Sequence, residues 1–278
     1  MKKWYAVIGD PIHQSMSPFM HDQWLKEGRL DGSYIPHHIR PEHLKDAVQS
    51  LKRLGCSGWN VTVPHKTAIL PYLDEIDETA KRMNAVNTVE VLPDGLLRGS
   101  NTDGAGFVYA LEEQFGQSSQ RGKVLVIGAG GAARGICFGL LEKGYGPITI
   151  TNRTVEKAEE LASQMTKTNA ITLQEAQASM EEFDLIVQTT SVGMSFADAG
   201  MPLNPSFIQE GTIVADIIYN PLETAFLRAA RENGGKTMNG VGMFVHQGAI
   251  SFAKWTNTKP NTEKMIEKIT EKLGGIRC

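Results

Sequence analysis

Four short polar segments of this sequence carry residue types that could bind a small hydroxylated molecule. They read SMSPFMH (15–21), NVTVPHK (60–66), NAVNT (84–88) and SNTDG (100–104). Hydroxyls and an ammonium can bind a carboxylate, whereas amides and an aspartate can hold several hydroxyl groups. These segments therefore predict a site for a small, anionic, polyhydroxylated molecule.

Lys66 and Asp103 are the residues of these segments that could support proton transfer. An ammonium can supply a proton to an oxygen atom while it stabilises the negative charge that develops there. A free lysine has a pKa of about 10.4. Burial would lower the pKa of Lys66, whereas a nearby Asp103 would raise it and leave Lys66 mainly as an electrostatic clamp. Both outcomes stay open. His65 could also exchange a proton, but a structural role is favoured.

The segment NVTVPHK is predicted to be a strand that Pro64 ends, with Val61 and Val63 on one face and Asn60 and Thr62 on the other. An exposed edge strand would show this pattern, and so would a strand whose end forms the floor of an active site. The other polar segments favour the active-site interpretation.

A strand, a glycine turn and a helix are predicted where the chain reads KVLVIGAGGAARG (123–135). Gly128, Gly130 and Ala133 have the spacing G-x-G-x-x-G/A. In that pattern the first glycine permits the tight turn, the second lets the backbone approach a pyrophosphate, and the third position allows close packing of helix on strand. A βα turn without a ligand would share the pattern. The context of strand, turn and helix favours a dinucleotide site, with the phosphate held at the helix N-terminus.

The next predicted strand, ITITNRT (148–154), indicates which dinucleotide is bound. An NAD site expects an acidic residue at the end of this strand, to accept a hydrogen bond from the ribose 2′-hydroxyl. Here the strand is followed by Asn152, Arg153 and Thr154. Arg153 could pair with a 2′-phosphate, and Lys157 could add positive charge. The sequence therefore favours NADP over NAD.

Strand and helix patterns alternate nearly throughout the chain, which predicts an α/β fold of two domains. One domain is predicted to bind substrate and to comprise residues 1–102 and 240–278. The other, residues 103–239, is predicted to be a Rossmann-type NADP-binding domain with a parallel sheet that includes FDLIVQTT (183–190) and GTIVADIIYN (211–220). The segment TVEVLPDGLLRG (88–99) is predicted to be a hairpin that turns at Pro93-Asp94-Gly95.

Composition limits the classes of function. The chain has 278 residues, 41% of them hydrophobic, and a net charge of −3 without a basic stripe, so neither nucleic acid nor a membrane is expected as a partner. No apolar run reaches the length of a spanning helix, and the N-terminus predicts a cytoplasmic protein. Cys56, Cys137 and Cys278 are too widely spaced to suggest a disulfide framework, and the histidines lack metal-ligand spacing, so no metal is expected.

Taken together, these segments resemble the shikimate dehydrogenase family, whose members reduce 3-dehydroshikimate to shikimate with NADPH in the pathway to chorismate and the aromatic amino acids. The matching segments span nearly the whole chain, in order: GDPIHQSMSPFMH, NVTVPHK, NAVNT, NTDG, GAGGAAR, NRT, YNP and GMFVHQ. One departure is Asp22, where the family usually has asparagine. Asp22 is expected to support its loop rather than to touch substrate.

The resemblance implies a role for each matching residue. Lys66 and Asp103 would be the catalytic pair. The residues that would bind substrate, with the two serines and the tyrosine at its carboxylate, are Ser15, Ser17, Asn60, Thr62, Lys66, Asn87, Asp103, Tyr219 and Gln247. The residues that would bind the cofactor are Gly128, Ala129, Gly130, Gly131, Ala132, Asn152, Arg153, Thr154, Lys157, Thr190, Ser191, Ile217, Gly240, Gly242 and Met243.

Two other functions would share parts of this pattern. A quinate/shikimate dehydrogenase that uses either cofactor would be favoured by a bulkier hydroxyl at Ser17 and an acid at Asn152. A non-catalytic NADP-binding sensor would need neither Lys66 nor Asp103. The sequence leaves the oligomeric state open, with a homodimer as one option.

Overall fold

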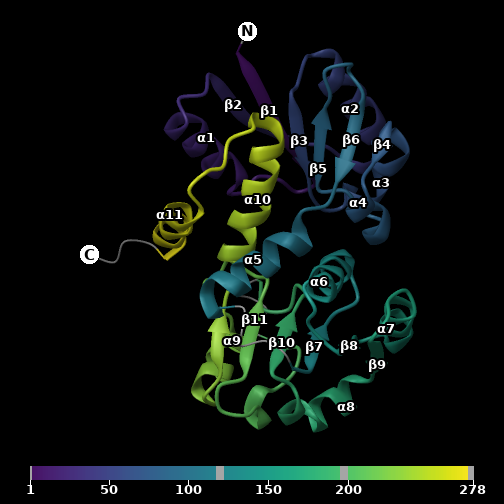
Figure 1. The fold of residues 1–278 in the computed structure, drawn as a ribbon, viewed down its shortest axis with the longest axis vertical. Helices are drawn as coiled ribbons and strands as arrows, with labels where there is room; N and C mark the ends of the chain where they lie inside the picture. Colours follow the sequence, from purple (N-terminus) through teal and green to yellow (C-terminus); the bar gives the residue numbers. More distant parts are fainter. Residues whose placement is uncertain (1, 117–121, 195–199, 275–278) are drawn as a thin grey trace. The chain divides into compact units, whose positions relative to one another are not determined.

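The computed structural model describes residues 2–116, 122–194 and 200–274 (Figure 1). Contacts divide the chain into two units. The first comprises Met1–Asp103 and Gln247–Met265, and the second comprises Gly104–His246 and Ile266–Cys278. Each unit contains a six-stranded sheet, as the predicted two-domain α/β fold requires. The predicted functional domains have boundaries at residues 102 and 240, close to the boundaries of these two units. That these domains bind substrate and NADP stays a prediction.

The first unit is built on a mixed sheet with the strand order β2-β1-β3-β5-β6-β4. Its strands are β1 (Lys3–Gly9), β2 (Gly32–His38), β3 (Gly58–Val61), β4 (Glu75–Ile76), β5 (Thr88–Val91) and β6 (Leu97–Ser100). Strand β1 lies between β2 and β3 and is parallel to both. Strands β5 and β6 form the predicted antiparallel hairpin, and Gly95 adopts φ +83° in its turn.

Helices and short 3₁₀ turns connect these strands. They are α1 (Ser17–Glu27), η1 (Pro41–His43), α2 (Leu44–Arg53), α3 (His65–Ala68), η2 (Leu70–Tyr72) and α4 (Glu78–Met83). Helix α1 begins with a proline in its first turn and buries Ser17, Met20, His21, Trp24 and Leu25. This spacing of three and four residues marks one helical face that packs inward.

The prediction for the segment NVTVPHK is wrong for Val63. Strand β3 ends at Val61, which is 2% exposed, whereas Val63 is 67% exposed. The amide of Thr62 still donates to Ile8, and the carbonyl of Val63 still accepts from Asp10, each at 3.0 Å. Pro64 has no N–H to continue the pairing, and the chain turns there into helix α3.

The second unit is built on a fully parallel sheet with the strand order β12-β11-β10-β7-β8-β9. Its strands are β7 (Val124–Ile127), β8 (Ile148–Thr151), β9 (Thr168–Ile171), β10 (Leu185–Gln188), β11 (Ile213–Asp216) and β12 (Lys236–Met238). This is the Rossmann order, which reverses between β7 and β10. Ligands of such sheets bind beyond the carboxyl ends of the strands at that reversal.

The remaining helices lie in the second unit, except that α5 begins at the last residue of the first unit and that α10 and α11 are divided between the units, with α10 in the first unit from Gln247 onward and α11 in the second from Ile266 onward. They are α5 (Asp103–Phe115), α6 (Gly131–Glu142), α7 (Val155–Ala162), α8 (Leu173–Ala178), η4 (Met180–Glu182), η5 (Pro205–Phe207), α9 (Ala225–Glu232), α10 (Val241–Thr256) and α11 (Thr262–Gly274). None of the helices described is long and apolar enough to cross a membrane.

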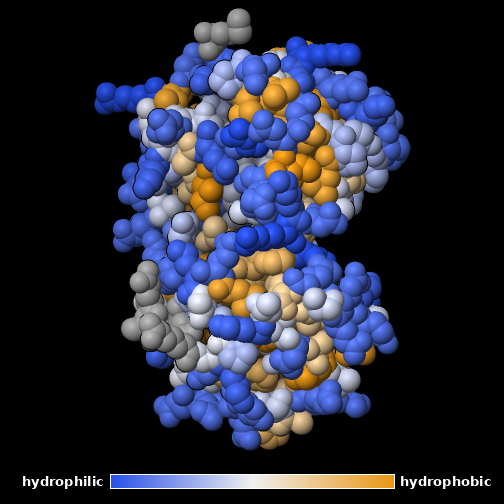
Figure 2. Space-filling view, turned by 45° about the vertical axis from the view of Figure 1, so that its right-hand side comes forward, coloured by the Kyte–Doolittle hydropathy of each residue, from blue (hydrophilic) through white to orange (hydrophobic). Residues whose placement is uncertain are grey.

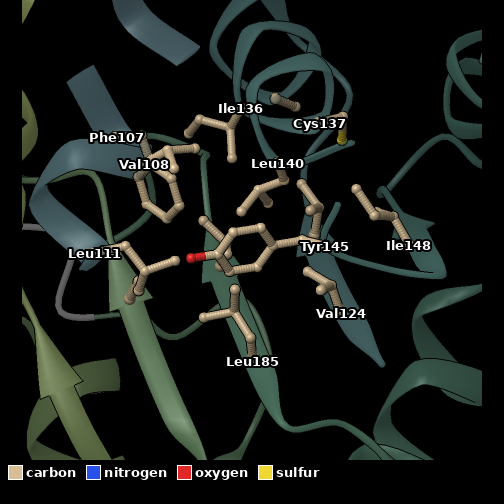
Figure 3. Close-up of a cluster of buried hydrophobic side chains, with 14 of the residues drawn as sticks. Phe107, Val108, Leu111, Val124, Ile136, Cys137, Leu140, Tyr145, Ile148 and Leu185 are labelled. Atoms are coloured by element: carbon tan, nitrogen blue, oxygen red, sulfur yellow. The ribbon is translucent and has the colours of Figure 1, made fainter. Parts of the chain in front are cut away.

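A core of apolar side chains joins α5 and α6 to the sheet of the second unit (Figure 3). Phe107 and Leu111 come from α5, Ile136 and Cys137 from α6, and Tyr145 lies among them. Cys137 is fully buried, as a small core residue should be. On the face shown in Figure 2, hydrophobic patches alternate with hydrophilic surface.

Candidate active site

Lys66 and Asp103 meet in the first unit. Lys66 lies in helix α3, directly after the turn at Pro64, and Asp103 is the first residue of α5. The ammonium of Lys66 donates to Oδ2 of Asp103 at 2.6 Å. The Lys66 side chain is 27% exposed and that of Asp103 is 8% exposed. An ammonium in this position can reach a bound molecule while its partner carboxylate is withdrawn from water.

Asn87 holds the other side of this carboxylate. Its Nδ2 donates to Oδ1 of Asp103 at 2.8 Å and to the hydroxyl of Thr102 at 2.9 Å. Its Oδ1 accepts from the backbone N–H of Thr102 at 2.9 Å and from the hydroxyl of Thr88 at 2.8 Å. Donors and acceptors on both sides fix the orientation of this amide. The segments NAVNT and SNTDG therefore form one hydrogen-bonded network around Asp103.

Asn60 lies 7% exposed at the end of β3 and joins the same network. Its Nδ2 donates to the carbonyl of Asn87 and to the hydroxyl of Ser251, each at 3.1 Å. Its Oδ1 accepts from the hydroxyl of Tyr34 at 2.7 Å. Both hydrogens of the Asn60 amide thus have acceptors within the protein, and Oδ1 keeps one lone pair for a ligand.

Ser15, Ser17 and Thr62 follow the carboxyl ends of two neighbouring parallel strands. Strands β1 and β3 pair through Ile8 and Val61, so the segments after them leave the same edge of the sheet. Ser17 is 8% exposed, and its N–H donates to the hydroxyl of Ser15 at 3.3 Å. The structure thus directs these three hydroxyl residues to the edge that also carries Asn60.

Gln247 is tied to this network through its backbone. Its carbonyl accepts from the hydroxyls of Thr102 and Ser251, each at 3.0 Å. Helix α10 therefore joins the site at Gln247 and Ser251, one helical turn apart. Tyr219 differs, because it belongs to the second unit. Its ring centroid lies 4.9 Å from that of Phe244, and burial raises the pKa of its phenol.

His65 is buried and structural. Its Nε2–H donates to the carbonyl of Ile39 at 2.6 Å, so the ring supports the segment after β2. The next residue, Lys66, differs from His65 because its side chain is partly exposed and its amine can reach a ligand.

The glycine turn of the second unit has the geometry of a phosphate-binding loop. Gly128 adopts φ +115°, and a Cβ there would lie 2.4 Å from the hydroxyl oxygen of Thr189. Gly130 and Gly131 face open space, where a Cβ would meet nothing within 4 Å. No side chain caps the first turn of α6, whose 12 residues begin at Gly131. Free N–H groups and open space at a helix N-terminus suit a pyrophosphate.

The loop after β10 and the turn before α10 follow the carboxyl ends of two strands, β10 and β12. Because the sheet is parallel, both leave it at the same edge. Gln188 is fully buried and accepts from the N–H of Thr190 at 2.6 Å, which shapes the segment that carries Thr190 and Ser191. Gly240 packs against Ile217, because a Cβ on Gly240 would lie 2.0 Å from the Ile217 carbonyl oxygen. The N–H of Gly240 also donates to Ile218 at 2.9 Å. These contacts bring Ile217 and Gly240 together. Met243 is 8% exposed in the adjoining core.

Asp216 anchors the loop that carries Ile217 and Tyr219. Its carboxylate accepts from the N–H of Ile218 at 3.0 Å and from the hydroxyl of Thr224 at 2.8 Å. Asp216 is 1% exposed, and burial raises the pKa of its carboxyl to about 6.

The tip of β8 presents positive charge to solvent. Arg153 and Lys157 are exposed, and neither forms an ion pair with any residue that the structure describes. Asn152 shapes the tip by donating from Nδ2 to the carbonyl of Thr154 at 2.9 Å. Thr154 is the residue before α7. Exposed cations without internal partners are available for an anionic ligand.

No cluster of three or more metal-ligating side chains occurs among residues 2–116, 122–194 and 200–274. Cys56 and Cys137 are buried and unpaired, and Cys278 lies outside the described residues.

Comparison with known proteins identifies the family. Residues 7–89 match the shikimate dehydrogenase substrate binding domain, residues 110–202 match the shikimate/quinate 5-dehydrogenase family, and residues 240–270 match the shikimate 5′-dehydrogenase C-terminal domain. A shikimate dehydrogenase (NADP(+)) of Lysinibacillus sphaericus is 52% identical over 275 residues, which cover 99% of this chain and 100% of that protein. The chain belongs to the shikimate dehydrogenase family.

Solved structures of the family share the fold. The shikimate dehydrogenase of Thermus thermophilus in complex with NADP(H) and shikimate is 36% identical, with a TM-score of 0.89 over 98% of this chain and 100% of that chain. The quinate dehydrogenase of Corynebacterium glutamicum in complex with NAD is 28% identical, with a TM-score of 0.91 over 97% of this chain and 99% of that chain.

The structure adds residues that the sequence did not single out. Thr88 and Thr102 contact Asn87, and Tyr34 and Ser251 contact Asn60. Thr88 and Thr102 lie inside the polar segments, and Ser251 follows Gln247 by one helical turn, so their spacing carried a signal. Tyr34 lies in a different strand from Asn60 and shows no local pattern.

Proposed function

We propose that this chain interconverts 3-dehydroshikimate and shikimate with NADP(H), as an oxidoreductase that acts on a CH–OH group in the pathway to chorismate and the aromatic amino acids. The observation that supports this most directly is the 2.6 Å contact between Lys66 and Asp103 in a network of buried amides and hydroxyls. A binding module would need no such pair, so this contact favours an enzyme over a sensor.

Lys66 and Asp103 are the proposed catalytic pair. NADPH, when bound, supplies the hydride that reaches the carbonyl carbon. The ammonium of Lys66 donates a proton to the carbonyl oxygen and stabilises the charge that develops there. In the oxidation of shikimate the neutral amine accepts the hydroxyl proton. Asp103 orients the lysine, and Asn87 orients Asp103.

The substrate is proposed to lie against the first unit. Ser15 and Ser17 bind its carboxylate, because their hydroxyls follow β1 at the edge that also carries Asn60. The residues proposed to bind its hydroxyls are Asn60, Thr62, Lys66, Asn87, Asp103 and Gln247. Tyr219 is also proposed to bind the carboxylate, as the family resemblance implies.

The cofactor is proposed to lie against the second unit. The turn of Gly128, Ala129, Gly130, Gly131 and Ala132 holds the pyrophosphate, since its glycines leave open space at the N-terminus of α6. The residues proposed to hold the 2′-phosphate are Asn152, Arg153, Thr154 and Lys157. Those proposed to face the nicotinamide are Thr190, Ser191, Ile217, Gly240, Gly242 and Met243.

The functional domains are proposed as residues 1–102 with 240–278 for substrate and residues 103–239 for NADP. A cytoplasmic location and a homodimeric assembly stay predictions.

Quinate with NAD is the second candidate pair, because the quinate dehydrogenase that this fold matches was solved with NAD. Arg153 and Asn152 argue against it, since an acidic residue at this tip would bind the 2′-hydroxyl of NAD and repel a 2′-phosphate.

The test is a turnover assay that follows the absorbance of reduced nicotinamide for each pair of shikimate or quinate with NADP⁺ or NAD⁺. Fast turnover with shikimate and NADP⁺ alone is the expected result. Comparable rates with quinate or NAD⁺ would assign a broader specificity. Absence of turnover with every pair would overturn the proposal and favour the sensor.

A further inference from the structure

The hydroxyl of Tyr34 contacts one residue of the proposed substrate site. Tyr34 belongs to β2, is 3% exposed, and donates to Oδ1 of Asn60 at 2.7 Å. Burial raises the pKa of Tyr34 well above its usual value, so the phenol remains a neutral donor. This hydroxyl thus connects β2 with the end of β3.

Tyr34 holds the oxygen side of the Asn60 amide. The opposite side of the amide faces the carbonyl of Asn87 at 3.1 Å, and the hydroxyls of Ser251 and Thr88 lie at 3.1 and 3.3 Å. A carbonyl accepts only, so the carbonyl of Asn87 requires that Nδ2 face it and that Oδ1 face Tyr34. The phenol donates to Oδ1 at 2.7 Å. Without the phenol, the amide would be held on its Nδ2 side alone, and its Oδ1 would be less precisely placed.

Tyr34 is held both through its ring and through its backbone. His21 stacks on it with ring centroids 4.2 Å apart and planes within 7°. The backbone N–H of Tyr34 donates to Oδ1 of Asp22 at 2.9 Å. This contact accounts for Asp22, which supports the strand and does not need to touch substrate. An asparagine in its place would offer the same oxygen.

His21 acts as a buried aromatic ring that packs against Tyr34. It is 1% exposed, and neither ring nitrogen has a hydrogen-bond partner among the described residues. Trp24, Phe252 and Trp255 surround it with ring centroids between 5.4 and 6.0 Å away. A rigid aromatic packing of this kind leaves Tyr34 little freedom, so its hydroxyl stays aligned with Asn60.

We propose that Tyr34, supported by His21, is a positioning residue that fixes Asn60 for substrate binding. This inference rests on the proposed function. Tyr34 acts through Asn60 and leaves proton transfer to Lys66 and Asp103. Its loss therefore weakens the binding of shikimate and leaves both the chemical step and the binding of NADP⁺ unchanged.

Tyr5 offers a matched control. It lies directly opposite Tyr34 in the pairing of β1 with β2, and it is 2% exposed. Its ring stacks on Trp255 with centroids 5.2 Å apart. A phenylalanine at either position keeps the ring and removes one buried hydroxyl from the same layer of the core.

The experiment compares steady-state kinetics of the wild type, Tyr34→Phe and Tyr5→Phe with shikimate and NADP⁺. Tyr34→Phe is expected to raise the KM for shikimate roughly two- to tenfold, the range expected for one neutral hydrogen bond. Its kcat and its KM for NADP⁺ should match the wild type, and Tyr5→Phe should leave all three constants unchanged. In an Asn60→Ala background, Tyr34→Phe should have no further effect on the KM for shikimate.

An unchanged KM for shikimate in Tyr34→Phe would overturn the inference alone. So would an equal change in Tyr5→Phe, or a full additional effect in the Asn60→Ala background, because each would show a general role in packing. Absence of turnover by the wild type would instead overturn the proposed function, and this inference with it.

Discussion

Lys66 and Asn87 share one carboxylate: Nζ of Lys66 lies 2.6 Å from Oδ2 of Asp103, and Nδ2 of Asn87 lies 2.8 Å from Oδ1. The Asp103 side chain is 8% exposed, so these two donors replace much of the water it would otherwise bind. Removing either donor therefore disturbs the position of the other. The pair and its amide are expected to behave as one unit in kinetics.

Asn87→Ala is expected to lower kcat/KM for shikimate about 10- to 100-fold and to reduce the free energy of unfolding by about 1–3 kcal/mol. The reason is that Asp103, Thr102 and Thr88 each lose a buried hydrogen bond to the Asn87 amide. Kinetics and urea denaturation measure the two effects. Asn233→Ala, at an exposed asparagine of the second unit, is the control. Wild-type activity in Asn87→Ala would remove this amide from the site.

Arg153→Ala is expected to raise the KM for NADP⁺ at least about tenfold, because a charge-assisted contact to the 2′-phosphate is lost. The weaker activity with NAD⁺ should hardly change, since NAD⁺ lacks that phosphate. The control is Arg53→Ala, at an exposed arginine of the first unit. Equal losses with both cofactors would place Arg153 outside the 2′-phosphate site.

Asp216→Asn is expected to alter the dependence of stability on pH. Burial raises the pKa of Asp216 from 3.8 to about 6, so its contribution to stability is fully present below the unfolded pKa and is lost as pH rises through about 6. The shift corresponds to on the order of 2–3 kcal/mol. Asparagine can keep both contacts, by accepting from Ile218 and donating to Thr224.

The free energy of unfolding, measured by urea denaturation from pH 5 to 8, tests this. Relative to the wild type, Asp216→Asn should gain stability as pH rises. Asp31→Asn, at an exposed aspartate, should not. A constant difference between Asp216→Asn and the wild type would contradict the raised pKa.

His21→Phe is expected to make the protein less sensitive to acid. Burial lowers the pKa of His21 from 6.5 to about 3, so its contribution is present above the unfolded pKa and is lost as pH falls below it. This loss amounts to about 2 kcal/mol at pH 5. Phenylalanine keeps the ring between Tyr34 and Trp24 without a group that titrates. The urea midpoint should fall less on acidification in His21→Phe than in the wild type or in the exposed control His43→Phe. Equal falls would contradict the assignment.

Local patterns predicted the elements that local chemistry determines. The turn at Gly128 and the hairpin at Gly95 both require a residue with positive φ, and glycine adopts that conformation without strain. A glycine in the sequence therefore predicts each turn. The error at Val63 has a tertiary cause. Its segment alternates like a strand, but β1 and the missing N–H of Pro64 determine where pairing ends.

The contacts of the candidate site could be inferred only through the resemblance. Lys66 and Asp103 are 37 residues apart, and no periodicity relates them. Tyr34 was missed for a similar reason. Its hydroxyl reaches Asn60 because β1 holds β2 and β3 on its two sides, and such pairing between distant segments leaves no local mark.

The most direct test of the account is the kcat for shikimate oxidation with NADP⁺ in Lys66→Ala, Asp103→Asn and the double variant. The account predicts that Lys66→Ala lowers kcat about 10²- to 10⁴-fold, with a KM for NADP⁺ close to that of the wild type. The double variant should be no slower than the slower single variant, because the two residues act together. A kcat near that of the wild type in Lys66→Ala would contradict the proposed chemistry.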